Sequence, residues 1–386
     1  MKILHLACAH KSNDTRILVK ECCSLAENGH EVIYYTAADS AIDNLGDCGK
    51  SNVKIKTYDL DMRGVAINRQ IVHSILARIQ NKKKMVQVIR HEKPDILHIH
   101  EFELMYIAGT VKKIFPSMKI IYDVHEDNAE QYAPALAIIC GAKPGGLLKK
   151  IIEKADMRYV RKADGVITVT PYLLNKLSSH NNNIVEIRNM PFDITETEED
   201  IAGREAVVCY CGGITEERGI STLCSIAPGI HGEVLAAGVL NRRYLEELTA
   251  KYDGVWGTKV RYLGYLDRTG VNKLYSRAVV GLCTLKYNKN IYNALPIKLF
   301  EYMAAGIPVV CSDFPLWKKI VTEENCGIAV HPENAEEILD AVNRLLDNRE
   351  LAQEMAVNGK NAIAKKYNWA LEEEKLLNFY HKLKYE

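Results

Sequence analysis

The sequence predicts an α/β fold made of two doubly wound, Rossmann-like domains that face a cleft. Short β-rich runs alternate with helical patterns along the whole chain, which is typical of parallel sheets covered by helices. The alternation breaks once, at an acidic, aperiodic stretch with the sequence FDITETEEDIAGRE. The chain of 386 residues is also longer than single hydrophobic cores usually grow. These observations predict two domains joined by one linker.

The N-terminal domain is predicted to span residues 1–190. It begins with a strand (KILHLACA), a helix that ends at a glycine (TRILVKECCSLAENG) and a second strand (HEVIYYTA), which together form a parallel βαβ unit. Further strands are expected at 53–60, 95–100, 119–125, 165–170 and 185–189, and helices around 67–92, 102–114 and 147–163.

The C-terminal domain is predicted to span 206–365, after a linker at 191–205. Its strands are expected at 206–211, 232–238, 259–265, 279–285, 308–313 and 327–330, and its helices at 219–228, 241–251, 270–277, 296–305, 334–347 and 350–365. The last segment, 366–386, is expected to form a helix that returns to the N-terminal domain. Ligands of such a chain should bind in the cleft, between the carboxyl ends of the two sheets.

Composition limits the class of protein. The formal net charge of +1 gives no indication of nucleic-acid binding. The charges are shared unevenly, with net +6 up to residue 190 and net −5 beyond it, which indicates separate surfaces with separate partners. The 11 cysteines lie mostly in apolar runs without metal-like spacing, as expected for reduced thiols of a cytosolic protein. The N-terminal apolar run is too short for a signal peptide, and no segment approaches the ~20 apolar residues of a membrane span, so we expect a cytoplasmic protein.

A charged pair, Lys298 and Glu301, lies inside the otherwise apolar run LPIKLFEYMAAGIPVV. Pro296 and Gly306 suit the start and the end of a helix on which the two charges share one face. A helix N-terminus attracts phosphate, Lys298 would add a positive charge there, and Glu301 could accept hydrogen bonds from ribose hydroxyls. The spacing therefore fits a nucleotide diphosphate. The alternative is an ordinary salt bridge on a solvated helix face.

A glycine turn in GGITEERGI follows the strand at 206–211. Gly212 and Gly213 would let the backbone approach a ligand closely, and Arg218 could contact a phosphate. No G-x-G-x-x-G motif is present in the sequence, which argues against a dinucleotide dehydrogenase.

At this point the chain resembles a family 4 glycosyltransferase of GT-B architecture, of the type that builds cell-surface polysaccharides. The resemblance covers essentially the whole chain and rests on the motifs DTRILVKECCSLAENGHEV, YDVHED, RNMP, YCGGITEERGI, LPIKLFEYMAAGIPVV, CGIAVHPENAEEI and YNWALEEEKLL. It implies retaining transfer of a hexosyl or N-acetylhexosaminyl group from a nucleotide-diphosphate sugar, expected to be UDP-linked. The acceptor would be a glycan or a lipid-linked glycan, and neither a cofactor nor a metal would be needed.

The resemblance also implies roles for single residues. Glu301 would bind the donor ribose and Lys298 the pyrophosphate, while Arg218 replaces the usual lysine of the glycine loop. His125 would lie near the transferred sugar and the leaving phosphate, so His125 and Glu301 are the expected catalytic residues. Leu295 and Asn293 complete the expected donor-binding set.

Two positions depart from the pattern of the family. Asn293 stands where many members have a glutamate that contacts the donor sugar, and Gly213 stands where many have an arginine. One charged contact is thus missing, so more of the phosphate charge should be neutralised by Arg218 and Lys298.

The acceptor side is expected to include Asp14, Arg16, His100 and Glu126. Asp14 can alternatively act as a helix cap, and His125 can be a structural histidine beside acidic neighbours. His98 and His100 share one strand face, but no further ligand with suitable spacing follows, so no metal site is predicted.

The basic helix at 147–163 combines apolar side chains with Lys and Arg residues, which predicts contact with an anionic membrane surface, on the inner face of the plasma membrane. Solvated helix faces are the alternative. Two rival functions remain open at this stage. One is a sugar-nucleotide epimerase of the same fold, and the other is a catalytically silent nucleotide-sugar-binding protein, which the departures at Asn293 and Gly213 favour.

Overall fold

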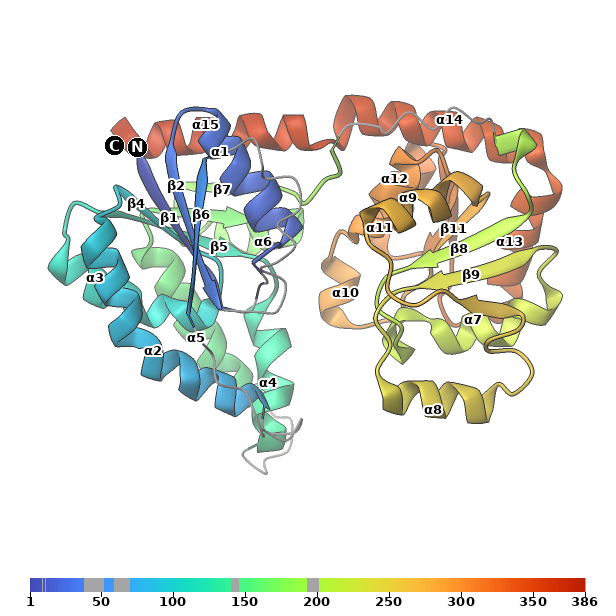
Figure 1. Cartoon of the computed structure of the whole chain (residues 1–386), viewed down its shortest axis with the longest axis horizontal. Coiled ribbons are helices and arrows are strands. Elements are labelled where there is room, and N and C mark those ends of the chain that lie inside the picture. The colour runs from blue at the N-terminus through green and yellow to red at the C-terminus, as the bar shows by residue number, and fades with distance from the viewer. Residues whose placement is uncertain are drawn as a thin grey trace. The chain divides into compact units, whose positions relative to one another are not determined.

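A computed structural model describes residues 1–8, 10, 12–37, 52–58, 70–139, 146–192 and 201–385 of the chain. The chain forms two compact units (Figure 1). Unit 1 comprises Met1–Asn189 and Glu372–Glu386, and unit 2 comprises Met190–Leu371. Most of the predicted linker, residues 193–200, lies outside the described part of the chain.

Unit 1 is built on a parallel sheet of seven strands in the order β3-β2-β1-β4-β5-β6-β7. The strands are β1 (Lys2–Leu6), β2 (Glu31–Ala37), β3 (Val53–Tyr58), β4 (Ile96–Ile99), β5 (Lys119–Val124), β6 (Gly165–Thr168) and β7 (Ile184–Glu186). The helices are the π-helix η1 (Thr15–Cys22), the 3-10 helix η4 (Phe102–Ile107), and α1 (Cys23–Glu27), α2 (Gln70–Glu92), α3 (Ala108–Ile114), α4 (Asn128–Ile139), α5 (Gly146–Lys162) and α6 (Pro171–Leu177).

Unit 2 has a parallel sheet of six strands in the order β10-β9-β8-β11-β12-β13. The strands are β8 (Val207–Cys211), β9 (Glu233–Ala237), β10 (Val260–Tyr262), β11 (Val280–Cys283), β12 (Val309–Ser312) and β13 (Gly327–Val330). The α-helices are α7 (Ile220–Ile226), α8 (Arg242–Lys251), α9 (Arg268–Arg277), α10 (Lys289–Asn293), α11 (Ile297–Ala304), α12 (Pro315–Glu323), α13 (Ala335–Asp347) and α14 (Arg349–Lys366), and short 3-10 helices lie at η5 (Ile201–Gly203), η6 (Glu216–Arg218) and η7 (Ala227–Gly229).

The last helix, α15 (Trp369–Tyr385), enters unit 1 at Glu372, and both chain termini lie in this unit (Figure 1). The backbone N–H of Arg188 and its guanidinium donate to the buried Glu372 carboxylate, at 2.9 and 2.5 Å for the closest pairs. This contact fixes the start of the returning segment.

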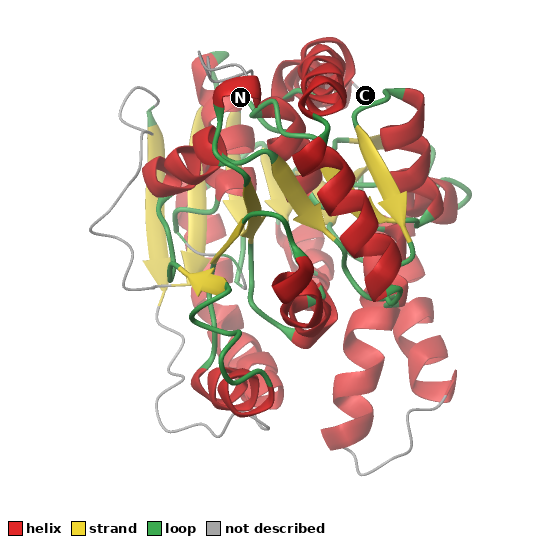
Figure 2. Cartoon of the chain, turned by 90° about the vertical axis from the view of Figure 1, so that its right-hand side faces the viewer, coloured by secondary structure: helices red, strands yellow, loops and turns green. Residues whose placement is uncertain are grey.

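Helices cover both faces of each sheet, and Figure 2 shows them on both sides of the strands. In unit 2, successive residues of β8 alternate between two apolar clusters, with Val208 and Tyr210 in one and Val207 and Cys209 in the other. In unit 1, Leu4 and Leu6 of β1 point into an apolar cluster, whereas the opposite face carries the buried His5. The predicted α/β fold with two doubly wound domains is confirmed.

Local details differ from the prediction. The loop expected after 125 contains α4, and the loop expected between 286 and 295 contains α10. Pro296 precedes α11 in extended conformation and is not its first helical residue. At the start of this helix Ile297 is 39% exposed, while Lys298 is buried.

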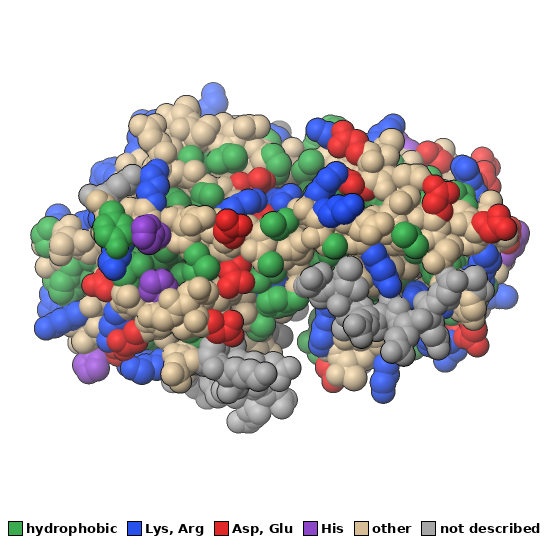
Figure 3. All heavy atoms as spheres, turned by 90° about the horizontal axis from the view of Figure 1, so that it is seen from above, with side chains coloured by type: hydrophobic (Ala, Val, Ile, Leu, Met, Phe, Trp, Pro, Cys, Tyr) green, Lys and Arg blue, Asp and Glu red, His purple; other side chains and the backbone are tan. Residues whose placement is uncertain are grey.

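The described surface mixes charges of both signs. On the face seen in Figure 3, Lys and Arg side chains are interspersed with Asp and Glu side chains. Within the described chain, no helix combines the length and the apolar character that a membrane crossing needs. Eight described cysteines carry free thiols, but Cys23 is disulfide-bonded, so the prediction of reduced thiols is wrong at that position.

Candidate functional site

Each sheet has one point where the strand order reverses, and the loops that leave the carboxyl ends of the strands there diverge to form a ligand-binding position. In unit 2 this point lies between β8 and β11, and in unit 1 between β1 and β4. In unit 2, Gly212 and Gly213 follow β8, and Asn293, Leu295, Lys298 and Glu301 follow β11. In unit 1, Asp14 and Arg16 follow β1, His100 follows β4, and His125 and Glu126 follow β5.

Lys298 is the central cation of the unit 2 site. Its side chain is 6% exposed, and its ammonium has no hydrogen-bond partner among the described residues. The ammonium lies 3.7 Å from the centroid of the Tyr210 ring, a cation–π contact that offsets only part of the lost hydration. A buried ammonium with free donors is suited to an anion that the described residues do not supply.

The glycine turn after β8 makes room for this ammonium. Gly212 has φ of +140°, and a Cβ added there would lie 3.0 Å from Lys298 Nζ. The φ of Gly213 lies outside the left-handed region that favours glycine, and a Cβ there would lie 3.5 Å from Nε of the exposed Arg218. The Tyr210 hydroxyl donates to the Gly213 carbonyl (2.8 Å) and so fixes the turn. The turn therefore brings backbone, Lys298 and Arg218 close to one another.

Two further glycines of this site were missed by the sequence analysis. Gly219 has φ of +80°, and a Cβ there would lie 2.2 Å from the Thr284 carbonyl oxygen; at Gly238, with φ of +146°, it would lie 1.7 Å from the Gly212 carbonyl oxygen. Both glycines allow close backbone contact at the carboxyl ends of neighbouring strands. The available signals were a glycine at the start of the predicted helix 219–228 and a glycine at the end of the predicted strand 232–238.

Glu301 does not pair with Lys298. Its carboxylate accepts hydrogen bonds from Arg268 Nη1 (2.6 Å) and from the Tyr275 hydroxyl (3.1 Å), and its side chain is 21% exposed. The alternative of a simple Lys298–Glu301 salt bridge is therefore wrong, because each charge has a different environment. Arg268 and Tyr275 were not predicted as site residues, since they lie on α9, far from the motif in sequence.

Asn293 and Leu295 lie just before α11. The Asn293 amide donates to the Lys289 carbonyl one turn back in α10 (2.9 Å). Leu295 is half-buried and packs against the apolar cluster under α11, and Trp317 Nε1 donates to the Ala294 carbonyl between the two residues (2.6 Å). Residues 293–295 are thus fixed by these hydrogen bonds and by apolar packing within unit 2.

In unit 1, His125 directly follows β5 and is 17% exposed. Its Nε2 lies 2.9 Å from the buried Asp123 carboxylate and 3.4 Å from His100 Nδ1. The accessible ring with a fixed carboxylate partner combines features of a functional and of a structural histidine. Glu126, the next residue, is exposed.

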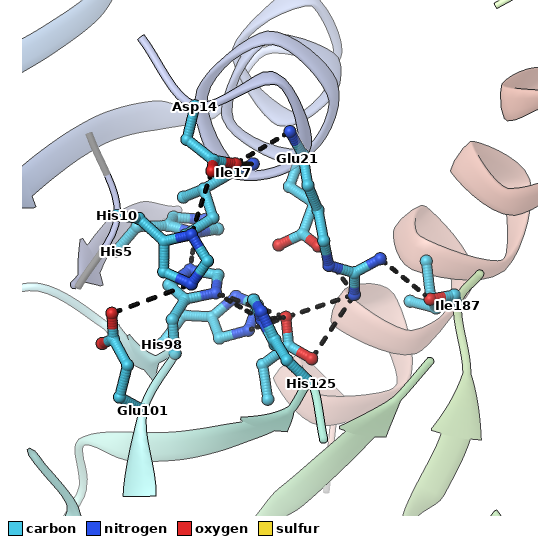
Figure 4. A network of polar contacts seen from close by, with 12 residues as sticks. His5, His10, Asp14, Ile17, Glu21, His98, Glu101, His125 and Ile187 are labelled. Carbon is cyan, nitrogen blue, oxygen red and sulfur yellow. Dashed lines mark hydrogen bonds and ion pairs between the residues drawn. The ribbon is translucent and has the colours of Figure 1, made fainter. Parts of the chain in front are cut away.

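Asp14 caps η1, because its carboxylate accepts from the backbone N–H groups of Arg16 and Ile17 (both 2.9 Å). The capping prediction is confirmed. Asp14 also bonds His10 Nδ1 (2.9 Å; Figure 4). Burial lowers the pKa of His10, but the Asp14 hydrogen bond and the Glu101 charge outweigh it and raise the pKa to about 9. A His10–Asp14 ion pair therefore lies at this sheet edge.

Two residues expected on the acceptor side are buried instead. Arg16 is 5% exposed and its guanidinium donates to Asp123 (3.2 Å) and to the Ile187 carbonyl (3.0 Å). His100 is 2% exposed and lies below His125. Both residues have structural contacts behind the site, because each interacts with the buried carboxylate of Asp123.

The network behind His125 contains a second group that sequence analysis missed. His5, Glu21 and His98 are fully buried (Figure 4). The ring centroids of His5 and His98 lie 5.1 and 4.3 Å from that of His100. Burial lowers the pKa of His100 to about 4 and that of His5 and His98 well below the usual value, so these rings are neutral. Glu21 and His5 could not be predicted because they come from η1 and β1, far from His98 in sequence.

Each half of the chain matches a family model of glycosyltransferases. Residues 192–378 match the family model of glycosyl transferases group 1, and residues 16–189 match that of glycosyltransferase family 4. Together the two models cover nearly the whole described chain. The chain belongs to family 4 of the glycosyltransferases.

Relatives and solved structures point the same way. An uncharacterized glycosyltransferase of Methanocaldococcus jannaschii is 25% identical over 315 residues, which cover 75% of this chain and 76% of the relative. The glycogen synthase of Mycobacterium tuberculosis is 19% identical over 90% of this chain and 85% of its own. Among solved structures, the sucrose-phosphate synthase of Thermosynechococcus elongatus has a TM-score of 0.76 at 16% identity, over 99% of both chains. The Anabaena protein HepE in complex with UDP has a TM-score of 0.72 at 13% identity, over 99% of this chain and 100% of its own. The fold is GT-B, and the chain is a glycosyltransferase.

Proposed function

We propose that the protein transfers a hexosyl or N-acetylhexosaminyl group, with retention, from a UDP-linked sugar to a glycan or lipid-linked glycan acceptor. The observation that carries this proposal is the buried ammonium of Lys298, which has free donors beside a glycine turn. The solved structure of HepE, which has the same fold, contains UDP. A diphosphate fits the positive charge, and the Glu301 carboxylate on the same helix fits ribose hydroxyls.

The proposed mechanism depends on stabilising the negative charge that develops on the leaving phosphate. As the bond between the sugar and the diphosphate breaks, negative charge grows on the leaving phosphate, where Lys298, Arg218 and the N-terminus of α11 stabilise it without a metal ion. Glu301 leaves Arg268 and Tyr275, or shares them, when it accepts the ribose hydroxyls. His125, oriented by Asp123, donates a hydrogen bond to the sugar or to the leaving phosphate. No protein nucleophile is needed, because the acceptor hydroxyl attacks from the face that the phosphate leaves and gives its proton to the departing phosphate oxygen.

A membrane surface is the proposed location of the acceptor. Leu147 (75% exposed) and Ile151 (56% exposed) lie one turn apart on α5, whereas Ile152 is buried, so only part of the predicted apolar stripe is available. The exposed basic residues of α5 are Lys150, Lys154, Arg158, Arg161 and Lys162. Apolar side chains flanked by cations fit an anionic lipid surface. Equal binding to neutral and anionic vesicles would contradict this location.

The experiment that tests the function begins with a thermal-shift screen of nucleotide sugars. Wild type should be stabilised by UDP-sugars, whereas Lys298→Met and Glu301→Gln should lose most of that shift. Lys318→Met is the matched control, because Lys318 is an exposed lysine of the same unit. Equal stabilisation of all four proteins would show that the site is misplaced.

Measurements of turnover distinguish a transferase from a silent binding protein and from an epimerase. Slow hydrolysis of a UDP-sugar, lost in His125→Asn, supports a transferase. Affinity without turnover for any donor or acceptor would support a silent binding protein, for which Asn293 in place of a charged contact is the favouring observation. Conversion of one UDP-sugar into its epimer would support the epimerase.

A further inference from the structure

A group of buried metal-binding side chains lies inside unit 1, on the sheet face opposite to Leu4 and Leu6. The β1–β4 pairing places His5 directly beside His98, and His100 follows on the same strand face. Glu21 points from η1 toward these rings (Figure 4). His5, Glu21 and His98 are 0% exposed and His100 is 2% exposed.

Several polar atoms of this group lack partners. Both carboxylate oxygens of Glu21 lack a hydrogen bond to any described residue, and so does Nε2 of His98. Oε1 of Glu21 lies 3.0 Å from Arg16 Nη2, but that guanidinium donates its hydrogen bonds to Asp123 and to the Ile187 carbonyl. Glu21 and Asp123 are both fully buried and share the single guanidinium of Arg16, so an additional positive charge beside Glu21 would balance the second carboxylate.

The outer nitrogens of the histidines are already held by neighbours. The Tyr380 hydroxyl lies 2.7 Å from His98 Nδ1 and 3.4 Å from His5 Nε2, and the Asp123 carboxylate lies 3.3 Å from His100 Nδ1. Metal-binding histidines characteristically direct their second nitrogen to such a carboxylate or hydroxyl, which fixes the ring orientation. Each ring therefore keeps one nitrogen for an inner ligand.

The inner atoms are close enough to share one ion. One ligand atom from each of the four side chains lies within 4.8 Å of all the others. His5 Nδ1 and His100 Nε2 are 2.9 Å apart. Two nitrogens that bind a tetrahedral zinc ion at about 2.0–2.1 Å are roughly 3.3 Å apart, so only a small movement is needed.

We propose that His5, Glu21, His98 and His100 bind one divalent transition-metal ion, with Zn²⁺ as the best match to three imidazoles and one carboxylate. Four protein ligands in a fully buried position define a structural site, which has no open position for a substrate. The ion would connect β1, β4 and η1 behind His125. It would take no part in binding the donor phosphates.

A second possible cluster, formed by His100, Asp123 and His125, is less suited to a metal. It offers three ligands, one fewer than a closed tetrahedral site needs, and His125 is partly exposed. Its carboxylate also has Arg16 as a partner. The test therefore has to distinguish the two clusters.

The experiment measures metal content and stability of the full chain. The protein is unfolded in guanidinium with EDTA, refolded with or without ZnCl₂ or CoCl₂, dialysed, and analysed by mass spectrometry for bound metal. Wild type should keep one equivalent of Zn²⁺, melt at a higher temperature than the EDTA-treated protein, and show the visible absorption bands of tetrahedral Co²⁺. Absence of bound metal after refolding with either ion would overturn the proposal.

Variants locate the ion. Glu21→Gln and His98→Asn should lose the metal, while His125→Asn and the exposed-surface control His231→Asn should keep it. Retention in Glu21→Gln together with loss in His125→Asn would assign the metal to the second cluster and contradict the proposal. Because buried variants can fail to fold, circular dichroism is recorded for each, and the wild-type comparison with and without Zn²⁺ decides the question independently of any variant.

Discussion

Two buried cations, one in each unit, differ in what surrounds them. Arg16 in unit 1 is 5% exposed and is surrounded by the carboxylates of Asp123 and Glu21 and by a carbonyl oxygen. Lys298 in unit 2 is 6% exposed, and among the described residues its ammonium has a cation–π contact with Tyr210 but no hydrogen bond or ion pair. A buried charge that is paired inside the chain needs no further partner, whereas one left without a partner is suited to an external ligand of opposite charge. The two positions thus show the difference between a supporting network and the proposed binding site.

The largest expected effect comes from removing the partner of Arg16. Asp123→Asn leaves a buried guanidinium without its main counter-charge, and breaking a buried pair in this way costs about 3–5 kcal/mol. Urea unfolding monitored by circular dichroism measures the loss, with Glu126→Gln, an exposed neighbour, as the control. A change below about 1 kcal/mol would show that Arg16 is not held by this pair.

A smaller effect is expected at the glycine turn beside Lys298. Gly212→Ala forces a side chain into a conformation with φ of +140° and toward the ammonium, a strain of about 1–3 kcal/mol. Gly213→Ala meets only an ordinary contact with Arg218 and is the matched control. Titration calorimetry with UDP should show weaker binding for Gly212→Ala alone. Equal affinities of the two variants for UDP would show that the glycine turn does not contribute to UDP binding.

The smallest expected effect has the opposite sign. Lys298→Met replaces an unpartnered ammonium by an apolar side chain of similar length, so the protein without ligand should become more stable, by about 0.5–2 kcal/mol. Thermal unfolding without nucleotide measures the gain. Destabilisation by more than about 1 kcal/mol would mean that Lys298 already has its counter-charge within the chain.

The sequence predicted both sheets and most helices because apolar alternation and glycine stops are local signals. It predicted Lys298 for the same reason, since proline, lysine and glutamate stand in one short motif. Arg16 and His100 were expected on the acceptor side, but both are buried beside Asp123. Asp123 lies 107 residues from Arg16 in sequence, and only the fold brings the two together. Arg268 and Glu21 were missed for the same reason.

Nucleotide binding to Lys298→Met tests the central claim most directly. Calorimetric titrations with UDP and with uridine are compared for wild type and the variant. If Lys298 binds the diphosphate, the variant should bind UDP about 10- to 100-fold more weakly, as expected for a lost charged hydrogen bond, and should bind uridine as wild type does. An unchanged affinity for UDP, or an equal loss for UDP and uridine, would contradict the account.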